Sequence, residues 1–301
     1  GGALLALGVV FLLEYLDDRV QSPADLRQIA DLPVLGALAK MPSDKDAENA
    51  RSGNLIGLNE PRHPITEAYR RLRTNLQYAN LDKEMRTLMV TSAEAGEGKS
   101  ITSANLAVVM AQSGARVILV DADLRKPKQH TVFGVSKRPG LAEALKGGDI
   151  EALLCPVTSK GGNLSLWLLP AGDTIPNPAE VLGSHRMQQL GKQLLELADI
   201  VIYDTPPVLA VTDSQVMGRM VDGALLVIDT QKTGSAAVHR ALESLLQVNT
   251  PLVGAVLNRL TSSARNYYYY YSYDAYYSDG DDDGKQQKGS RRRKQDRVVT
   301  P

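Results

Sequence analysis

Thr91-Ser92-Ala93-Glu94-Ala95-Gly96-Glu97-Gly98-Lys99-Ser100 is the stretch that decides the fold. It follows the apolar run Thr87-Leu88-Met89-Val90 and precedes a segment of helical character. Gly96 and Gly98 allow the backbone to curl so that successive N–H groups point at phosphate oxygens. The start of the following helix adds the positive end of its dipole. The stretch therefore predicts a phosphate-binding loop between a strand and a helix.

The same loop carries side chains suited to nucleotide chemistry. Lys99 would reach the β- and γ-phosphates, and the Ser100 hydroxyl would ligate Mg²⁺. The strict pattern G-x-x-x-x-G-K-[ST] requires glycine at position 93, where Ala93 stands. A glycine loop that only starts a helix is the alternative, and the acidic residues described next argue against it. The residues expected to contact ATP are Ala95, Gly96, Glu97, Gly98, Lys99, Ser100 and Ile101.

Two acidic motifs follow other apolar runs. Val117-Ile118-Leu119-Val120 leads into Asp121 and Asp123, and Ile200-Val201-Ile202-Tyr203 leads into Asp204. Ligand chemistry concentrates at the carboxyl edge of parallel sheets. A single aspartate after a strand is more often a helix cap. Three of them at strand ends, in one domain with a phosphate loop, indicate Mg²⁺ binding and activation of a nucleophile.

From residue 66 to residue 262 short apolar runs alternate with stretches of helical length. The runs are continuous, as in strands buried on both faces of a parallel sheet. The pattern predicts one α/β domain of the P-loop NTPase kind, with a doubly wound, mostly parallel sheet. The expected strands contain Thr87–Val90, Val117–Val120, Leu166–Leu169, Ile200–Tyr203, Ala224–Ile228 and Leu252–Leu257.

The segments outside this domain have a different character. Residues 1–17 open with an uncharged apolar run, which we interpret as the C-terminal part of a transmembrane helix; a buried core helix is the alternative. Residues 18–65 predict a juxtamembrane connector, in which Ser22 and Pro23 start a helix and the stretch 41–64 is a polar linker. Residues 263–301, rich in Gly, Ser, Gln and charge, predict a disordered tail.

The composition narrows the function. The formal net charge is zero, so nothing in it suggests a partner nucleic acid. The single cysteine, Cys155, excludes a disulfide framework and a cluster held by cysteines. The chain has 12 Tyr but only 2 Phe, an imbalance that core packing does not explain. Eight of the tyrosines lie close together in the tail, and they are Tyr267, Tyr268, Tyr269, Tyr270, Tyr271, Tyr273, Tyr276 and Tyr277.

These motifs together resemble the bacterial tyrosine kinases (BY-kinases) of exopolysaccharide assembly. The resemblance rests on the phosphate loop, on Asp121-Ala122-Asp123-Leu124-Arg125, on Asp204-Thr205-Pro206-Pro207 and on the tyrosine cluster. Residues 67–75 and the stretch Pro176-Asn177-Pro178-Ala179-Glu180 add to it. The family usually has proline where Ala95 stands, a difference that affects the rigidity of the loop and none of its ligands.

The resemblance implies a role for each site residue. Lys99, Asp121, Asp123 and Asp204 would be the catalytic set, with Ser100 and Asp123 holding Mg²⁺ and Asp204 assisting through water. Asp121 would take the proton of the tyrosine hydroxyl. The activity implied is transfer of the γ-phosphate of ATP to the protein's own tail tyrosines.

The resemblance also implies a setting and partners. The kinase domain would lie on the cytoplasmic side of a bacterial plasma membrane and regulate synthesis and export of exopolysaccharide or capsule. Its partners would be the polysaccharide export machinery, a phosphotyrosine phosphatase and further copies of itself. Glu67, Arg70 and Arg73 recur every three residues, so they share one broad helical stripe. That stripe is a solvated face or, as the resemblance implies, the contact that joins subunits into a ring and lets each tail enter a neighbour's site.

Two other functions compete with the kinase. ParA/MinD-type ATPases share the fold but carry a lysine five positions before the phosphate-loop lysine, and Glu94 stands there. A carboxylate cannot neutralise a transition-state phosphate, which disfavours that mechanism. A polysaccharide chain-length scaffold that only binds nucleotide is disfavoured by the complete set of Lys99 and three aspartates. We expect Lys99→Met to abolish phosphorylation of the tail and leave the fold intact, since the lysine would supply charge and not packing.

Overall fold

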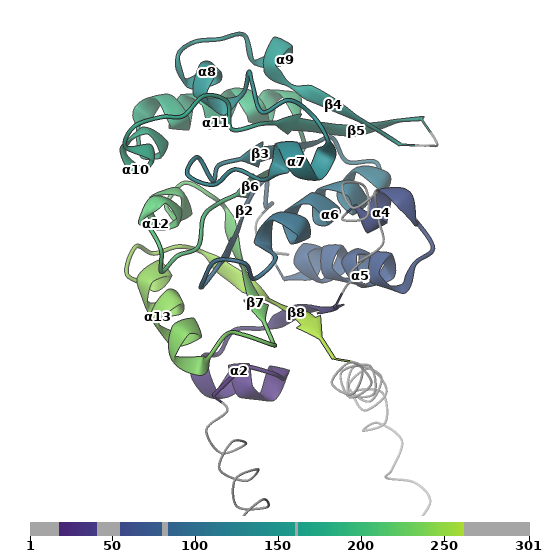
Figure 1. Ribbon diagram of the computed structural model, residues 1–301, viewed down its shortest axis with the longest axis vertical. Helices are drawn as coiled ribbons and strands as arrows, with labels where there is room; N and C mark the ends of the chain where they lie inside the picture. Colours follow the sequence, from purple (N-terminus) through teal and green to yellow (C-terminus); the bar gives the residue numbers. More distant parts are fainter. Residues whose placement is uncertain (1–17, 41–54, 80–83, 160–161, 262–301) are drawn as a thin grey trace, which may run out of the picture. The chain divides into compact units, whose positions relative to one another are not determined.

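An eight-stranded sheet organises the part of the chain that the computed structural model describes, which is residues 18–40, 55–79, 84–159 and 162–261 (Figure 1). The strand order is β1-β8-β7-β2-β6-β3-β5-β4. All neighbouring strands are parallel except β4 and β5. The strands are β1 (Val34–Ala39), β2 (Thr87–Ser92), β3 (Val117–Asp121), β4 (Cys155–Ser159), β5 (Gly162–Leu169), β6 (Ile200–Asp204), β7 (Gly223–Asp229) and β8 (Leu252–Leu260).

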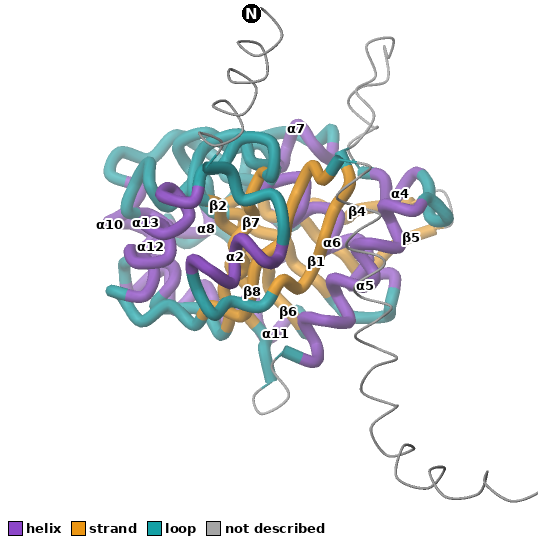
Figure 2. Tube along the Cα trace, turned by 90° about the horizontal axis from the view of Figure 1, so that it is seen from below, coloured by secondary structure: helices purple, strands orange, loops and turns teal. Residues whose placement is uncertain are grey.

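Helices cover both faces of the sheet, so the central strands are buried on both sides (Figure 2). Every residue of β2, β3, β6 and β7 is buried, which explains why these strands appear in the sequence as continuous apolar runs. Leu88 and Val90 of β2 pack on the face of α5 and α6, whereas Met89 packs on the face of α11 and α12. The described helices are α2 (Pro23–Ile29), α4 (Ile56–Asn59), α5 (Pro64–Tyr78), α6 (Lys99–Gln112), α7 (Gln129–Phe133), α8 (Leu141–Leu145), α9 (Ile150–Leu153), α10 (Pro178–Leu182), α11 (His185–Leu197), α12 (Asp213–Gly218) and α13 (Ser235–Leu246).

The segment 18–65, expected to be a connector, differs in the structure because part of it belongs to the sheet. Val34–Ala39 forms the edge strand β1, which pairs in parallel with β8. Its Gly36 lies against α5, where a Cβ would be 3.1 Å from the Leu72 side chain. The helix start at Ser22 and Pro23 is confirmed, since the Ser22 side chain accepts a hydrogen bond from the backbone of α2. Of the expected polar linker, residues 41–54 lie outside the described residues.

Two of the predicted segments lie at the ends of the chain. Residues 1–17, expected to be the remnant of a membrane helix, and residues 262–301, which carry the tyrosine cluster, lie outside the described residues. Within the described ranges, no helix combines the length and the apolar character needed to cross a bilayer.

The parallel strands bring the predicted motifs to one edge of the sheet. In β3 and β6, Asp121 pairs in register with Asp204, and in β2 and β6, Val90 pairs with Asp204. The phosphate loop follows β2 directly, and β2 lies between β7 and β6 in the sheet. The carboxyl ends of β2, β3 and β6 therefore form the floor of the site.

Candidate nucleotide and phosphotransfer site

The phosphate loop turns on two glycines in the left-handed backbone region. Gly96 has φ 86° and Gly98 has φ 95°, and Gly98 is the N-cap of α6. Gly98 carries a second restriction, because a Cβ there would collide with Nδ2 of Asn258. That amide, at the end of β8, donates to the Glu97 carbonyl at 2.8 Å and holds the loop in place. Asn258 has no signal in the sequence, since it lies 160 residues away in the chain and only the fold brings it to the loop.

The two glycines predict unequal costs of substitution. Gly96→Ala adds only backbone strain, of about 1 kcal/mol, because its φ is positive and an added Cβ would meet no neighbouring atom. Gly98→Ala adds similar strain and also displaces Asn258, so we expect at least a tenfold further loss of nucleotide affinity. Titration calorimetry with ADP and Mg²⁺ measures both variants, and equal affinities for the two would contradict the role of Asn258.

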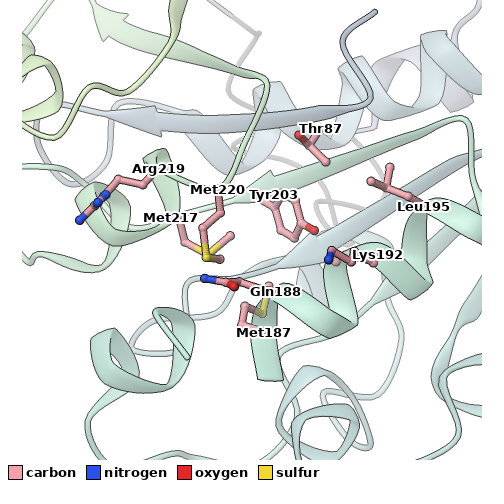
Figure 3. Close-up of a pocket in the computed structure, with 10 residues that line it drawn as sticks. Thr87, Met187, Gln188, Lys192, Leu195, Tyr203, Met217, Arg219 and Met220 are labelled. Carbon is pink, nitrogen blue, oxygen red and sulfur yellow. The ribbon is translucent and has the colours of Figure 1, made fainter. Parts of the chain in front are cut away.

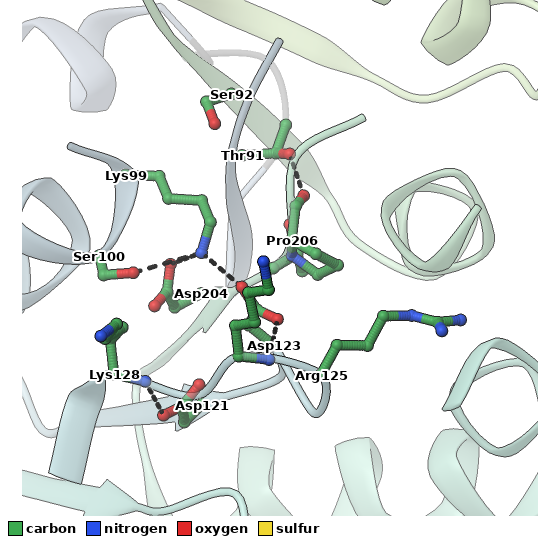
Figure 4. Close-up of polar contacts among 12 residues, drawn as sticks. Thr91, Ser92, Lys99, Ser100, Asp121, Asp123, Arg125, Lys128, Asp204 and Pro206 are labelled. Atoms are coloured by element: carbon green, nitrogen blue, oxygen red, sulfur yellow. Dashed lines mark hydrogen bonds and ion pairs between the residues drawn. The ribbon is translucent and has the colours of Figure 1, made fainter. Parts of the chain in front are cut away.

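Lys99 lies at the centre of the polar cluster shown in Figure 4. Its Nζ donates to Asp123 Oδ2 at 2.9 Å and to Asp204 Oδ1 at 3.4 Å, and lies 3.2 Å from Ser100 Oγ. Only 8% of Lys99 is exposed. The carboxylates around it raise the pKa of Lys99 against the opposing effect of burial, so the lysine is charged here. The structure thus brings together Lys99, Ser100, Asp123 and Asp204 as predicted.

The ammonium of Lys99 occupies a position suited to a metal cation. The oxygens around it, a hydroxyl and two carboxylates, are those that Mg²⁺ prefers. No group of three His, Cys, Asp or Glu side chains in the described part of the chain is arranged to hold a metal alone. Mg²⁺ is usually bound by one or two carboxylates together with substrate phosphates. Ser100, Asp123 and Asp204 would supply the protein's share of the ligands.

Asp121 lies beside this cluster and is fully buried. Its Oδ2 accepts hydrogen bonds from the backbone N–H groups of Lys128 at 3.0 Å and Gln129 at 2.9 Å. Its Oδ1 is buried without a hydrogen-bond partner among the described residues. Burial and the neighbouring carboxylate of Asp204 raise the pKa of Asp121 to about 8. Burial also raises the pKa of Asp204, against the lowering effect of Lys99. A carboxylate with a raised pKa and a free oxygen is suited to accept a proton.

Gln129 joins the three motifs and was missed by the sequence analysis. Its side-chain nitrogen donates to Asp204 Oδ2 at 2.8 Å and lies 3.0 Å from both the Ser100 carbonyl and Ser103 Oγ. Its backbone N–H holds Asp121. A glutamine eight residues after Asp121 fits no known motif. Its role becomes visible only in the folded chain, where the segment after β3 brings Gln129 back to the site. Gln129 is a positioning residue of the site.

Glu97, expected to contact the nucleotide, turns its side chain into the protein. Its carboxylate accepts hydrogen bonds from the Thr233 hydroxyl and from the backbone N–H of Glu94, and its side chain is buried. Burial raises the pKa of Glu97. Only its backbone N–H is left to serve phosphates. Lys232, in the same loop as Thr233, donates to the Ala95 carbonyl at 2.8 Å and lies 3.6 Å from Glu94.

The stripe expected to join subunits lies on α5. Glu67 Oε2 and Arg70 Nη1 form an ion pair of 3.1 Å, and Arg70 Nη2 also donates to the Pro61 carbonyl. Arg73 donates to the Val109 carbonyl at 3.2 Å, so part of its hydrogen-bonding capacity is used within the chain. The interface role of these residues stays a prediction. The eight tail tyrosines lie outside the described residues.

Comparison with known proteins gives this site a family. Residues 84–269 match the ParA family described as NUBPL iron-transfer P-loop NTPases. Over 206 residues the chain is 43% identical to the tyrosine-protein kinase YwqD of Bacillus subtilis (strain 168), a match that covers 68% of this chain and 85% of YwqD. This chain belongs to the bacterial tyrosine-protein kinases. The predicted family and P-loop α/β fold are therefore confirmed.

Other members of the kinase family agree. The tyrosine-protein kinase Etk of Escherichia coli (strain K12) is 33% identical over 276 residues, which cover 87% of this chain but only 38% of Etk. The solved kinase domain of E. coli ETK has a TM-score of 0.73 and 32% identity, and the match covers 81% of this chain and 96% of that domain. The iron-transfer part of the ParA description has no counterpart in a chain whose single cysteine is Cys155.

Proposed function

We propose that this bacterial tyrosine kinase is an ATP- and Mg²⁺-dependent autokinase that phosphorylates the tyrosines of its own C-terminal tail. One observation carries the proposal. Lys99 lies within 3.4 Å of Ser100, Asp123 and Asp204, and the buried Asp121, with a raised pKa, lies beside them. This arrangement can bind a triphosphate, hold a cation and accept a proton at one edge of the sheet.

Each residue contributes a separate part of the transfer. The N–H groups at the start of α6 would bind the phosphates, and Lys99 would move from the carboxylates to the β- and γ-phosphates. Asp123 and Asp204, released from Lys99, would then face the metal together with Ser100. Bound Mg²⁺ supplies positive charge that neutralises the developing negative charge on the transferring group.

Asp121 would accept the tyrosine proton through Oδ1, its free oxygen. With a pKa of about 8, it lies within roughly two units of a phenol, whose pKa is about 10. A proton can therefore pass between the two groups at little cost. Phosphoryl transfer depends mainly on positioning and charge neutralisation, so this proton transfer increases the rate but is not its main source.

The tail is the proposed substrate because it offers many hydroxyls on a tether. Tyr267–Tyr271, Tyr273, Tyr276 and Tyr277 lie within forty residues of the end of β8. A flexible tether raises the effective concentration to the order of millimolar. We propose that tails enter the sites of neighbouring subunits in a ring joined by Glu67, Arg70 and Arg73, so that phosphorylation occurs in trans.

Mixing an inactive chain with an active chain that lacks the tail tyrosines tests transfer in trans. A Lys99→Met chain keeps its tyrosines, and an active chain whose eight tail tyrosines are changed to Phe keeps its site. We expect the Lys99→Met tail to become labelled only in the mixture, at a rate that rises with the concentration of the active chain. Labelling of the tail at a rate independent of that concentration would contradict transfer between subunits.

The cellular setting rests on the resemblance to BY-kinases. We propose that residues 1–17 end a membrane helix and place this domain at the cytoplasmic face of the bacterial plasma membrane. There it would regulate exopolysaccharide or capsule export, with a phosphotyrosine phosphatase resetting the tail.

The second candidate function is a ParA-type ATPase switch, which the ParA family match favours. An ATPase of that kind transfers the γ-phosphate of ATP to a water molecule, so the tail tyrosines stay unmodified.

A further inference from the structure

A pocket of about 290 Å³ lies between α11 and α12, on the sheet face opposite α5 and α6 (Figure 3). Its lining comes from four elements and includes none of the residues assigned above to the nucleotide site. The volume is near the lower limit of pockets that bind small molecules, about 300 Å³. It has room for one side chain or a small ligand and is too small for a nucleotide.

The pocket contains a hydrogen-bond donor without a partner. Tyr203 is only 3% exposed, and its hydroxyl makes no hydrogen bond to any residue that the structure describes. The hydroxyl lies above α11 at Gly191, where an added Cβ would be 3.4 Å away. Burial raises the pKa of Tyr203, so the hydroxyl keeps its proton. Because Tyr203 lines the pocket, its hydroxyl is available to donate a hydrogen bond to a ligand that carries an acceptor atom.

The charge around the pocket is positive. Lys192 and Arg219 are exposed lining residues, and neither has a carboxylate partner among the described residues. In Figure 3, Lys192 lies on the Tyr203 side of the pocket, while the Arg219 guanidinium extends outward at the opposite end. Asp222, the carboxylate beside the pocket, already accepts hydrogen bonds from the backbone N–H and the hydroxyl of Thr87. The free donors therefore favour an anion.

The rest of the lining is apolar and rich in thioethers. Met187 and Met217 are buried, and Met220 and Leu195 complete the wall. Methionine sulfur makes favourable contacts with aromatic rings and adapts to their shape. Apolar walls, a phenol donor and cations at the mouth together fit an aromatic ring that bears an anionic group.

We propose that this pocket binds an aryl phosphate, and that its natural occupant is a phosphotyrosine side chain of the protein's own tail. The inference rests on the proposed function, because the tail must be phosphorylated to supply that group. Lys192, on the Tyr203 side, would bind the phosphate through charge-assisted hydrogen bonds with the Tyr203 hydroxyl as a neutral donor, and Arg219 adds positive charge at the other end of the pocket. Tyr203 directly precedes Asp204, and consecutive strand residues face opposite sides of the sheet. A product tyrosine could therefore dock here while the nucleotide site is occupied.

The test uses the full chain carrying Lys99→Met, whose unmodified tail cannot compete. Methyl-labelled methionines report binding by NMR, with Met187, Met217 and Met220 assigned through Met→Leu variants. Added N-acetyl-phosphotyrosine amide is expected to shift these three methyl signals saturably and leave Met110, buried on the opposite face of the sheet, unshifted. N-acetyl-tyrosine amide and inorganic phosphate, which each lack half of the recognised group, are expected to bind at least tenfold more weakly.

Variants identify the donors. Lys192→Ala with Arg219→Ala is expected to weaken probe binding at least tenfold, and Tyr203→Phe several-fold. Arg186→Ala, which removes an exposed cation of α11 outside the pocket, is the matched control and should leave affinity unchanged. Unshifted pocket methyls, equal binding of the unphosphorylated amide, or an undiminished affinity of the double variant would each overturn the proposal.

A final arm connects the pocket to the tail. Wild-type chain phosphorylated with Mg-ATP is expected to show the same methyl shifts without any added probe, and phosphatase treatment should reverse them. If the tail is phosphorylated and the methyl signals stay in place, the tail is not the occupant, although the autokinase proposal stands. If the probe binds but the tail is never phosphorylated, the autokinase proposal fails and the tail is excluded as the source.

Discussion

Lys99→Met is expected to reduce phosphorylation of the tail at least about 100-fold and also to destabilise the nucleotide-free protein. The loss of transfer follows from the loss of a positive charge at the phosphates, where removal of one stabilising group costs about 10²–10³ in rate. The effect on stability departs from the expectation drawn from the sequence. Because Lys99 is buried between Asp123 and Asp204, its removal leaves buried carboxylates without a cation, which costs about 3–5 kcal/mol.

Urea unfolding without nucleotide measures that cost, and phosphotyrosine detection measures transfer. The matched control is Lys99→Met combined with Asp204→Asn, which removes one carboxylate along with the lysine and should recover part of the lost stability. A Lys99→Met chain as stable as the wild type would show that the buried ion pairs contribute nothing to folding. Normal phosphorylation by that chain would exclude Lys99 from the transfer.

Asp121→Asn is expected to slow tail phosphorylation about 100-fold and to change ADP affinity less than about threefold. A general base typically increases the rate of a reaction about 10²–10⁴-fold. We expect the lower end of that range here, because positioning dominates phosphoryl transfer. Single-turnover transfer and calorimetric titration separate the two quantities. An equal loss of transfer and of nucleotide affinity would place Asp121 among the residues that bind metal and nucleotide.

The same variant should remove a pH dependence of stability. The pKa of Asp121 is about 8 in the folded protein against an ordinary value of 3.8, so the folded state favours the protonated form. Its contribution to stability is therefore fully present below about pH 4 and is lost as the pH rises to about 8. Without nucleotide or metal, the wild type should become less stable relative to Asp121→Asn over that range. A difference between the two that does not change with pH would contradict the raised pKa.

The sequence was sufficient to locate the central strands and the aspartates that gather around Lys99. Continuous apolar runs located β2, β3, β6, β7 and β8, because strands buried on both faces need apolar residues at every position. Parallel pairing then placed Asp121, Asp123 and Asp204 at one edge next to Lys99. The edge strand β1 was missed, since a six-residue run that contains Gly36 and two alanines has a weak strand signal.

The remaining features depend on contacts between distant parts of the chain. Gln129 acts on Asp204 and Ser100, and Asn258 on Glu97, through hydrogen bonds that no local pattern encodes. The burial of Lys99 likewise follows from the packing of α6 against the sheet. For this reason the position of Lys99 beside Ser100, Asp123 and Asp204 was predicted, while its burial between two carboxylates was not.

The most direct test of the autokinase proposal is the intact mass of the full chain before and after incubation with Mg-ATP, with Lys99→Met as the control. We expect the wild-type mass to increase by whole phosphate groups, and peptide mapping to place them among the eight tyrosines from Tyr267 to Tyr277. The Lys99→Met chain should gain none. A wild-type chain that hydrolyses ATP while its mass stays unchanged would contradict the account and favour an ATPase switch.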